Sequence, residues 1–342
     1  MMGPHRNPAA ERLRELLNSP TGVIQAPGCY DDLTARLVEQ EGFPCAFMSG
    51  FSVSGARGFP DTQMLAYSEM LDSCRAITEA VKSIPLIADG DTGYGNAVNV
   101  KRTVQGYARA GVACIMIEDQ VAPKKCGHPA GKEVIPFEDA CMRVMAAIDA
   151  RDEGADICIL ARTDARASLG LDEAIRRCRA FHAMGADIAF LEAPRTVEEM
   201  RRYCSEVGGP KMANLIEGGS TPFLSVDELE EVGYKLVIYS TSLVSTSIKA
   251  VRGVLGALKN GHDTTPHISS FSDLKAVVGF NEYNVEERKY AVASKQQQEP
   301  SASKTPTDSR TSWPEFKHFS GTIARVGSMA STIASEGSVQ FD

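Results

Sequence analysis

The sequence predicts an α/β fold, a (β/α)8 TIM barrel with extra C-terminal helices, and two patterns indicate it. Eight short, almost continuously apolar segments recur along the chain, as expected for parallel strands buried on both faces. Longer amphipathic segments separate them, and eight such units over roughly 240 residues have the size of one barrel. The predicted strands are residues 22–25, 45–48, 85–89, 114–118, 157–162, 188–192, 211–214 and 235–239.

Helical patterns fill the intervals between these strands. Apolar residues recur at helical spacing in 98–110 and 172–184. Thr196 and Ser225 open two further helices as N-caps followed by acidic residues. A doubly wound sheet is the alternative, but the glycine cluster of residues 90–95 lacks the G-x-G-x-x-G spacing of a dinucleotide-binding loop.

Three regions are expected. Residues 1–20 form an N-terminal extension with a helix at 10–17, and residues 21–292 form the catalytic barrel with C-terminal helices. The late segments within 271–290 are predicted to be helical and to pack on the barrel or on a neighbouring subunit. Residues 293–342 are rich in Ser, Thr, Gln and Lys, and contain too few apolar residues to offset the entropy of ordering. We therefore expect a disordered tail there.

Composition narrows the function. The net charge is −8 and no long basic block occurs, which argues against nucleic-acid binding. No apolar run approaches the roughly 20 residues that span a bilayer. The nine cysteines are dispersed and form no C-x-x-C pair, as in reduced intracellular proteins. With no secretory signal recognised, we expect a cytoplasmic protein.

Carboxylates cluster where predicted strands end. Asp89 and Asp91 follow the third strand, and Glu118 ends the fourth. Catalytic groups of a barrel lie at the C-terminal ends of its strands, so these side chains should meet. Several hard oxygen ligands suit Mg²⁺, with Mn²⁺ as a possible substitute. The alternative is that the acids cap the helices that follow.

A reactive cysteine is predicted just after the fourth strand, in the run Lys124-Lys-Cys126-Gly-His128. Cationic neighbours favour the thiolate. A buried, inert thiol is the alternative, but the flanks are polar and the segment is rich in Pro and Gly. His128 is expected to orient charge or to bind a substrate carboxylate. Arg162, after the fifth strand, either pairs with Asp164 or binds a carboxylate with its guanidinium fork.

Several stretches together resemble the isocitrate lyase/phosphoenolpyruvate mutase superfamily over roughly residues 20–260. They are Ser49-Gly50, Asp61, residues 88–95, 117–120, 124–128, 161–164, 191–193 and 214–219. The resemblance implies a (β/α)8 barrel, a homotetramer that exchanges a C-terminal helix, and Mg²⁺ near Asp89, Asp91 and Glu118. It also implies a gating loop that carries Cys126.

The same resemblance implies roles for individual side chains. Cys126 would donate or accept the proton. The implied catalytic residues are Cys126, Lys124, His128, Arg162 and Glu192. The implied substrate-binding residues are Tyr30, Ser49, Gly50, Asp61, Gly127, Asn214, Glu217 and Ser240.

The implied chemistry is Mg²⁺-dependent carbon–carbon cleavage of a small 2-oxo or 2-hydroxy di- or tricarboxylate. Tyr30 resembles the branch of dimethylmalate lyases and oxaloacetate hydrolases, and not 2-methylisocitrate lyase. Ser240 resembles the oxaloacetate hydrolases, because lyase relatives often carry proline at that position. The first expectation is therefore hydrolysis of oxaloacetate to oxalate and acetate. Lyases of 2-methylisocitrate or 2,3-dimethylmalate are the alternative, and a phosphonomutase or a non-catalytic scaffold is more distant. Ser240 could instead be a helix N-cap.

Overall fold

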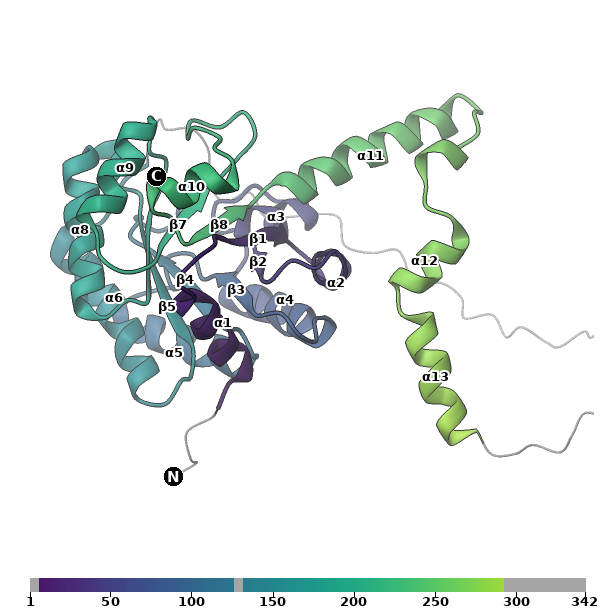
Figure 1. The fold of residues 1–342 in the computed structure, drawn as a ribbon, viewed down its shortest axis with the longest axis horizontal. Coiled ribbons are helices and arrows are strands. Elements are labelled where there is room, and N and C mark those ends of the chain that lie inside the picture. Colours follow the sequence, from purple (N-terminus) through teal and green to yellow (C-terminus); the bar gives the residue numbers. More distant parts are fainter. Residues whose placement is uncertain (1–5, 126–131, 292–342) are drawn as a thin grey trace, which may run out of the picture. The chain divides into compact units, whose positions relative to one another are not determined.

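A closed barrel of eight parallel strands forms the centre of the molecule (Figure 1). The computed structural model describes residues 6–125 and 132–291. Each strand pairs with its neighbours in sequence, and β1 closes the barrel against β8. All eight predicted strands are confirmed, although β1 runs further than expected. Their bounds are β1 Ile24–Cys29, β2 Ala46–Met48, β3 Leu86–Asp89, β4 Cys114–Glu118, β5 Cys158–Thr163, β6 Ile188–Leu191, β7 Lys211–Asn214 and β8 Leu236–Tyr239.

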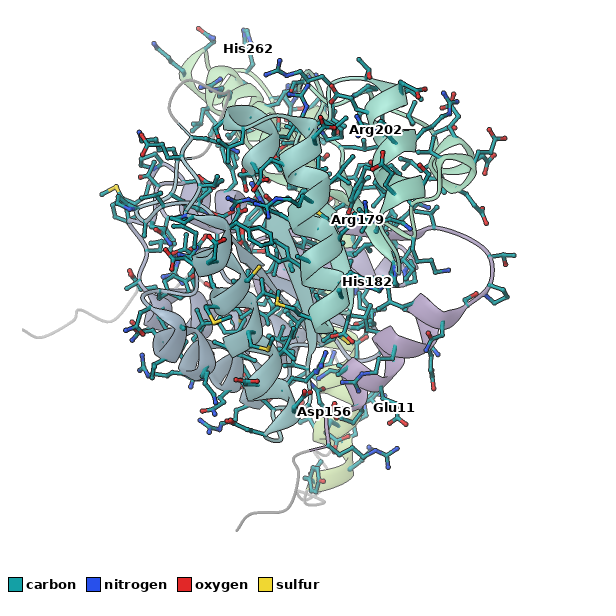
Figure 2. All side chains as sticks on the ribbon, turned by 90° about the vertical axis from the view of Figure 1, so that its left-hand side faces the viewer. Glu11, Asp156, Arg179, His182, Arg202 and His262 are labelled. Carbon is teal, nitrogen blue, oxygen red and sulfur yellow. The ribbon has the colours of Figure 1, made fainter. Side chains whose placement is uncertain are left out.

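Helices surround the barrel and present a charged outer face. On α9, for example, Arg202 pairs at the surface with Asp172 and Glu206, both at 2.7 Å (Figure 2). Thr196 and Ser225 cap α9 and α10, as the sequence predicts. The helices are α1 Pro8–Asn18, α2 Asp32–Gln40, α3 Gly50–Ala56, α4 Tyr67–Ala80, α5 Ala97–Arg109, α6 Phe137–Asp152, α7 Ala165–Ser168, α8 Leu171–Met184, α9 Val197–Glu206, α10 Val226–Val232, α11 Ser242–Lys259, η1 Thr265–His267, α12 Phe271–Val277 and α13 Phe280–Tyr290.

The barrel interior is a packed core that helix α1 shares. Leu13 of α1 is fully buried in the same cluster as Met116 and Phe190, whose side chains come from β4 and β6. Asn7 holds the start of the helix, because its Nδ2 donates to the carbonyl of Val112 at 2.8 Å. The N-terminal extension therefore contributes to the core.

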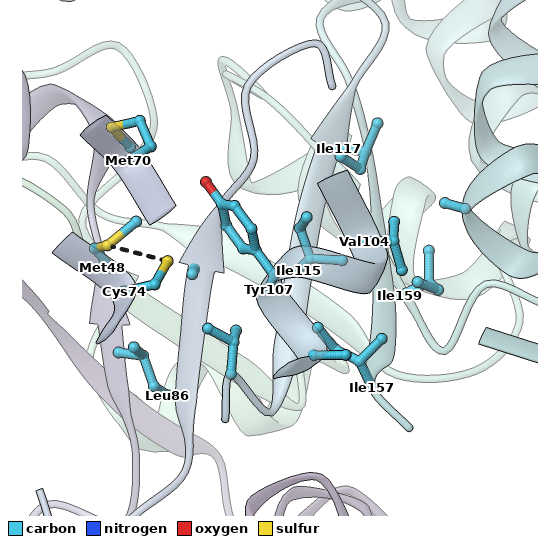
Figure 3. Close-up of a cluster of buried hydrophobic side chains, with 14 of the residues drawn as sticks. Met48, Met70, Cys74, Leu86, Val104, Tyr107, Ile115, Ile117, Ile157 and Ile159 are labelled. Atoms are coloured by element: carbon cyan, nitrogen blue, oxygen red, sulfur yellow. Dashed lines mark hydrogen bonds between the residues drawn. The ribbon is translucent and has the colours of Figure 1, made fainter. Parts of the chain in front are cut away.

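A second core lies between the strands and the helices (Figure 3). Tyr107 of α5 is fully buried there, and its hydroxyl donates to the carbonyl of Asp89 at 3.1 Å. Cys74 lies 3.7 Å from the sulfur of Met48. Burial raises the pKa of Cys29 in this core to about 12, and that of Cys158 in the barrel interior likewise to about 12, so both thiols act as packing groups. Tyr107 links this core to the end of β3.

The C-terminal helices expose large apolar side chains. No residue of α12 or α13 is buried, and Phe271 is 75% exposed. Other exposed apolar residues of this segment are Ile248, Val251, Leu255, Leu258, Ile268, Leu274, Phe280, Tyr283 and Val285. Within residues 6–125 and 132–291, no helix combines the length and apolar character that crossing a membrane requires.

Candidate active site

A cavity of about 570 Å³ opens at the C-terminal ends of the barrel strands. Many of the predicted site residues line it, together with an apolar wall. The predicted residues in its lining are Ser49, Asp61, Asp89, Glu118, Lys124, Arg162, Glu192, Asn214 and Ser240. The apolar side chains are those of Phe47, Met116, Ile216, Ile238, Val244 and Ile248. The cavity therefore combines a charged floor with an apolar side.

Some predicted residues lie elsewhere. Tyr30 does not line the cavity, because its hydroxyl is hydrogen-bonded to Ser247 of α11 at 2.6 Å. Glu217 is exposed and accepts a hydrogen bond from Ser242 at 2.6 Å. Both predicted substrate contacts are thus engaged with α11. Cys126, Gly127 and His128 lie outside the described residues.

The carboxylates of Asp89 and Asp91 are held by a tight turn after β3. Asp91 adopts a left-handed backbone conformation, with φ at 50°. Its amide donates to Asp89 Oδ1 at 3.0 Å, and the Tyr94 hydroxyl donates to Asp91 Oδ2 at 2.8 Å. Gly50 lies against this turn, and a Cβ there would come 2.6 Å from Asp89 Oδ2. Only glycine fits at residue 50 without moving that carboxylate.

These acids do not cap helices. Helix α5 is capped by Asn96, and α6 begins after Pro136, so Asp89, Asp91 and Glu118 serve neither. The alternative explanation for the strand-end acids is therefore wrong.

The ammonium of Lys124 lies among the carboxylates. Its Nζ is 2.8 Å from Asp61 Oδ1, 2.5 Å from Asp91 Oδ1 and 3.8 Å from Asp89 Oδ2. Burial by itself would lower the pKa of Lys124, but the attraction of Asp89, Asp91 and Asp61 outweighs it and raises the pKa well above its usual value. Lys124 is therefore a buried, permanently charged cation.

The donor set suits a hard divalent cation. Asp91 Oδ1, both carboxylate oxygens of Glu118 and Glu192 Oε2 are buried without a hydrogen-bond partner among the described residues. Such oxygens are the ligands that Mg²⁺ prefers. As they stand, no three Asp, Glu, His or Cys side chains within 6–125 and 132–291 converge on one point, while Lys124 lies between Asp61 and Asp91. The chemical nature of these oxygens fits a divalent cation, and Lys124 is the group that would have to move to admit it.

Burial raises the pKa of two acids in the cavity. Desolvation raises the pKa of Glu118 to about 8, although Arg162 lies 3.2 Å away and opposes the shift. Burial likewise raises the pKa of Asp89, against the opposing attraction of Lys124. Without an additional positive charge, Glu118 retains its proton near neutral pH.

This shift predicts a pH dependence for the metal-free protein. Glu118 keeps its proton in the folded state up to about pH 8, whereas the ordinary value is 4.5. Its contribution to the free energy of unfolding is therefore complete below 4.5 and is lost as the pH rises through about 8. Urea unfolding in EDTA should show a decline across this range, and Glu118→Gln should make the decline shallower. The same slope in Glu118→Gln would contradict the assignment; Glu138→Gln, at an exposed position of α6, is the control.

Arg162 pairs with Asp164, which is the first of its two predicted roles. Its Nε and a terminal nitrogen donate to the two oxygens of Asp164 at 2.8 and 3.0 Å, and Lys132 donates to Asp164 at 2.7 Å. Burial would raise the pKa of Asp164, but Arg162 and Lys132 hold it well below its usual range. Arg162 thus pairs with Asp164 and still lines the cavity. Lys132, the other cationic partner of Asp164, also lines the cavity.

A buried network behind Arg162 was not predicted. Asp119 accepts hydrogen bonds from the Asp164 amide at 2.9 Å, the Thr163 hydroxyl at 2.6 Å and the Arg177 guanidinium at 2.9 Å. Side chains alternate along a strand, so Glu118 faces the cavity while Asp119 faces helix α8. That alternation is the signal in the sequence that could have separated the two acids. Asp119 fixes the backbone that carries Asp164.

Ser240 lies in the cavity and not at a helix cap. Its hydroxyl donates to Asn214 Oδ1 at 2.9 Å. The N-cap of α11 is Thr241, and no side chain caps that helix. Ser49, in contrast, both lines the cavity and caps α3, accepting from the Ser52 amide at 3.2 Å. The N-cap alternative for Ser240 is wrong.

Comparison with known proteins gives consistent relatives. The family model of phosphoenolpyruvate phosphomutase matches residues 13–259. A 2,3-dimethylmalate lyase from Eubacterium barkeri is 43% identical over 287 residues, which cover 82% of this chain and 98% of the relative. A solved oxaloacetate acetylhydrolase, in complex with the inhibitor 3,3-difluorooxalacetate, superposes with a TM-score of 0.80 at 34% identity, covering 83% of this chain and 98% of that one. A phosphonopyruvate hydrolase bound to oxalate and Mg²⁺ gives a TM-score of 0.74 at 31% identity, with 82% and 99% coverage.

The matched region contains the barrel and the strand-end residues of the cavity. Together with the geometry above, it establishes that the chain belongs to the phosphoenolpyruvate mutase/isocitrate lyase superfamily, as a carbon–carbon bond-cleaving enzyme.

Proposed function

We propose that the protein hydrolyses oxaloacetate to oxalate and acetate in a Mg²⁺-dependent reaction. The observation that carries the proposal is the Ser240 hydroxyl in the cavity, hydrogen-bonded to Asn214 at 2.9 Å. A hydroxyl there can bond to a hydrated carbonyl of the substrate, which proline cannot do. The solved oxaloacetate acetylhydrolase with a TM-score of 0.80 supports this choice.

The reaction balances with water as co-substrate. Water adds to the C2 carbonyl, and the gem-diol then loses its C2–C3 bond. The leaving fragment is the enolate of acetate, and oxalate remains. Cleavage takes a proton from the gem-diol, and Cys126 gives its thiol proton to the enolate carbon as general acid. Of the two protons of the added water, one restores the thiol and the other leaves to solvent as oxalate ionises. Lys124, which lines the cavity, would add positive charge near the substrate, and His128 would bind a substrate carboxylate.

The described side chains would bind the substrate and hold its developing charge. The Arg162 guanidinium, fixed by Asp164, faces the cavity where carboxylate and alkoxide oxygens would lie. Ser49 can donate its hydroxyl hydrogen to a substrate carboxylate, because its oxygen already accepts from Ser52. Asp89, Asp91 and Glu118 would hold the Mg²⁺ ion, which would polarise substrate oxygens as a Lewis acid. Glu192 completes the polar floor.

A lyase that acts on 2,3-dimethylmalate is the second candidate. Its support is the apolar side of the cavity, where Ile216, Val244 and Ile248 can contact methyl groups. The Eubacterium barkeri relative at 43% identity bears that activity in its name. Both candidate reactions use the charged floor of the cavity. They differ in the substrate group that lies beside Ser240, which is a hydrated carbonyl in the first reaction only.

Substitution of Ser240 separates the candidates. Ser240→Ala should lower kcat/KM for oxaloacetate by about 10-fold or more, because an unsatisfied hydrate hydroxyl costs roughly 1–3 kcal/mol. The same change should leave cleavage of 2,3-dimethylmalate nearly unaffected. The measurement follows two products for wild type and variant: oxalate released from oxaloacetate, and the keto acid released from 2,3-dimethylmalate. Efficient cleavage of dimethylmalate by the wild type, without oxalate from oxaloacetate, would replace the first candidate by the second.

We also propose a cytoplasmic homotetramer that exchanges a C-terminal helix between subunits. The exposed apolar residues of α11 to α13 support association, since such side chains are normally covered. The eight cysteines of the described residues are free thiols, as expected in a reducing compartment. Light scattering of the purified protein would give the mass, and a monomer would contradict the assembly.

A further inference from the structure

Lys124 occupies an unusual position for a lysine. Its side chain is only 3% exposed, and three aspartates from two different segments surround its ammonium. Asp89 ends β3 and Asp91 lies in the turn that follows, whereas Asp61 precedes helix α4. Buried charges are normally paired, and these aspartates are the partners of the Lys124 ammonium.

The backbone at Lys124 is fixed to the same segments. Its amide donates to Gln63 Oε1 at 2.9 Å, and Gln63 Nε2 donates to Thr92 at 2.7 Å. The next amide, that of Lys125, donates to Gln120 at 3.0 Å. The backbone of Lys124 is therefore held by hydrogen bonds, and a change in the position of its ammonium would come from rotation of the side chain.

The ammonium offsets the negative charge of the carboxylates, but it does not supply all of their oxygens with hydrogen bonds. Asp91 Oδ1 is 2.5 Å from Nζ, yet it has no hydrogen bond of acceptable geometry. A Mg²⁺ ion would approach such an oxygen to about 2.0–2.1 Å. Two cations this close would repel strongly in a buried site, so they compete for Asp91 Oδ1.

Asp61 is the partner that the ammonium would keep if it moved away from Asp91. It lies 2.8 Å from Nζ and has no other ion-pair partner among the described residues. A small rotation of the lysine side chain would keep this contact while releasing Asp91.

We propose that Lys124 is an exchangeable internal counterion of the metal site. In the metal-free protein its ammonium neutralises Asp89 and Asp91, and on binding of a divalent cation it withdraws to Asp61. This inference rests on the proposed metal site. Lys124 competes with the cation for the same oxygens, so it lowers cation affinity while stabilising the metal-free fold.

The test measures metal binding, not turnover. Mn²⁺ is titrated into metal-free protein at constant pH, and the free ion is followed by electron paramagnetic resonance. Lys124→Met, which keeps the length of the side chain but removes its charge, should bind Mn²⁺ about 10-fold more tightly or better. Its melting temperature in EDTA should be below that of the wild type, and the gap should close in saturating Mn²⁺. Lys125→Met, at the exposed neighbouring position, should match the wild type in both measurements.

A double-mutant cycle adds a second test. Asp61→Asn removes the alternative partner, so Lys124 stays with Asp91 and Mn²⁺ should bind more weakly. In the Lys124→Met background, Asp61→Asn should have little effect. If Asp61 were instead a metal ligand, Asp61→Asn would weaken Mn²⁺ binding in both backgrounds. That result would contradict the movement of Lys124 to Asp61.

The outcomes distinguish this inference from the metal site itself. Equal or weaker Mn²⁺ binding by Lys124→Met would overturn the exchange and leave the metal site standing. No Mn²⁺ binding by any of the proteins would overturn both.

Discussion

Cys126→Ala is expected to lower turnover by about 10²–10⁴-fold, the usual contribution of a positioned general acid. The enolate left by carbon–carbon cleavage needs a proton on carbon, and alanine cannot provide one. Cys126 is the cysteine of the Lys-Lys-Cys-Gly-His run, with cationic neighbours in sequence. Steady-state rates of oxalate formation, with thermal unfolding measured alongside, give the effect on chemistry apart from folding.

Cys141→Ala is the matched control. Cys141 is a partly exposed thiol on α6, outside the cavity lining. Its loss should leave the rate within about twofold, as for a surface substitution. Full activity of Cys126→Ala would show that the cysteine is not the general acid. It would not contradict the proposed roles of the metal and of Arg162.

Arg162→Met should have the second large effect, and it should act on both activity and stability. Arg162 holds Asp164 with two hydrogen bonds and lies 3.2 Å from Glu118. Removing one partner of such a buried pair costs about 3–5 kcal/mol, because the remaining charges lose their counterion. The loss of charge stabilisation in the cavity should lower kcat/KM by about 10²–10³-fold. Urea unfolding and kinetics, measured on the same preparation, test both parts.

Arg202→Met serves as the control for Arg162→Met. Arg202 of α9 lies at the surface (Figure 2), where it pairs with Asp172 of α8 and Glu206 of α9. Exposed pairs contribute at most about 1 kcal/mol, so stability and rate should barely change. Equal effects of the two substitutions would show that Arg162 has no special place in the site.

The strands and the strand-end acids could be predicted because buried parallel strands are short apolar runs that point their last residues toward one face. Alternation along β4 would also have separated Glu118 from Asp119. Leu13 could not be placed in the barrel core from its own helix, since an amphipathic pattern does not say what the apolar face meets. The contacts of Tyr30 and Glu217 with α11 likewise depend on the tertiary position of that helix.

Lys124 shows a different reason why sequence falls short. Its neighbours in sequence suggested a role beside Cys126, but its ammonium lies among acids that are 33 to 63 residues away along the chain. Long-range ion pairs of this kind depend on which loops the barrel brings together. The motif therefore identified the residue, and the fold was needed to find its partners.

Product analysis by ¹³C NMR tests the central claim most directly. Purified protein with Mg²⁺ and labelled oxaloacetate should form oxalate and acetate in equal amounts, and EDTA should stop the reaction. Pyruvate and carbon dioxide as the only products, or no consumption beyond the rate without enzyme, would contradict oxaloacetate hydrolysis.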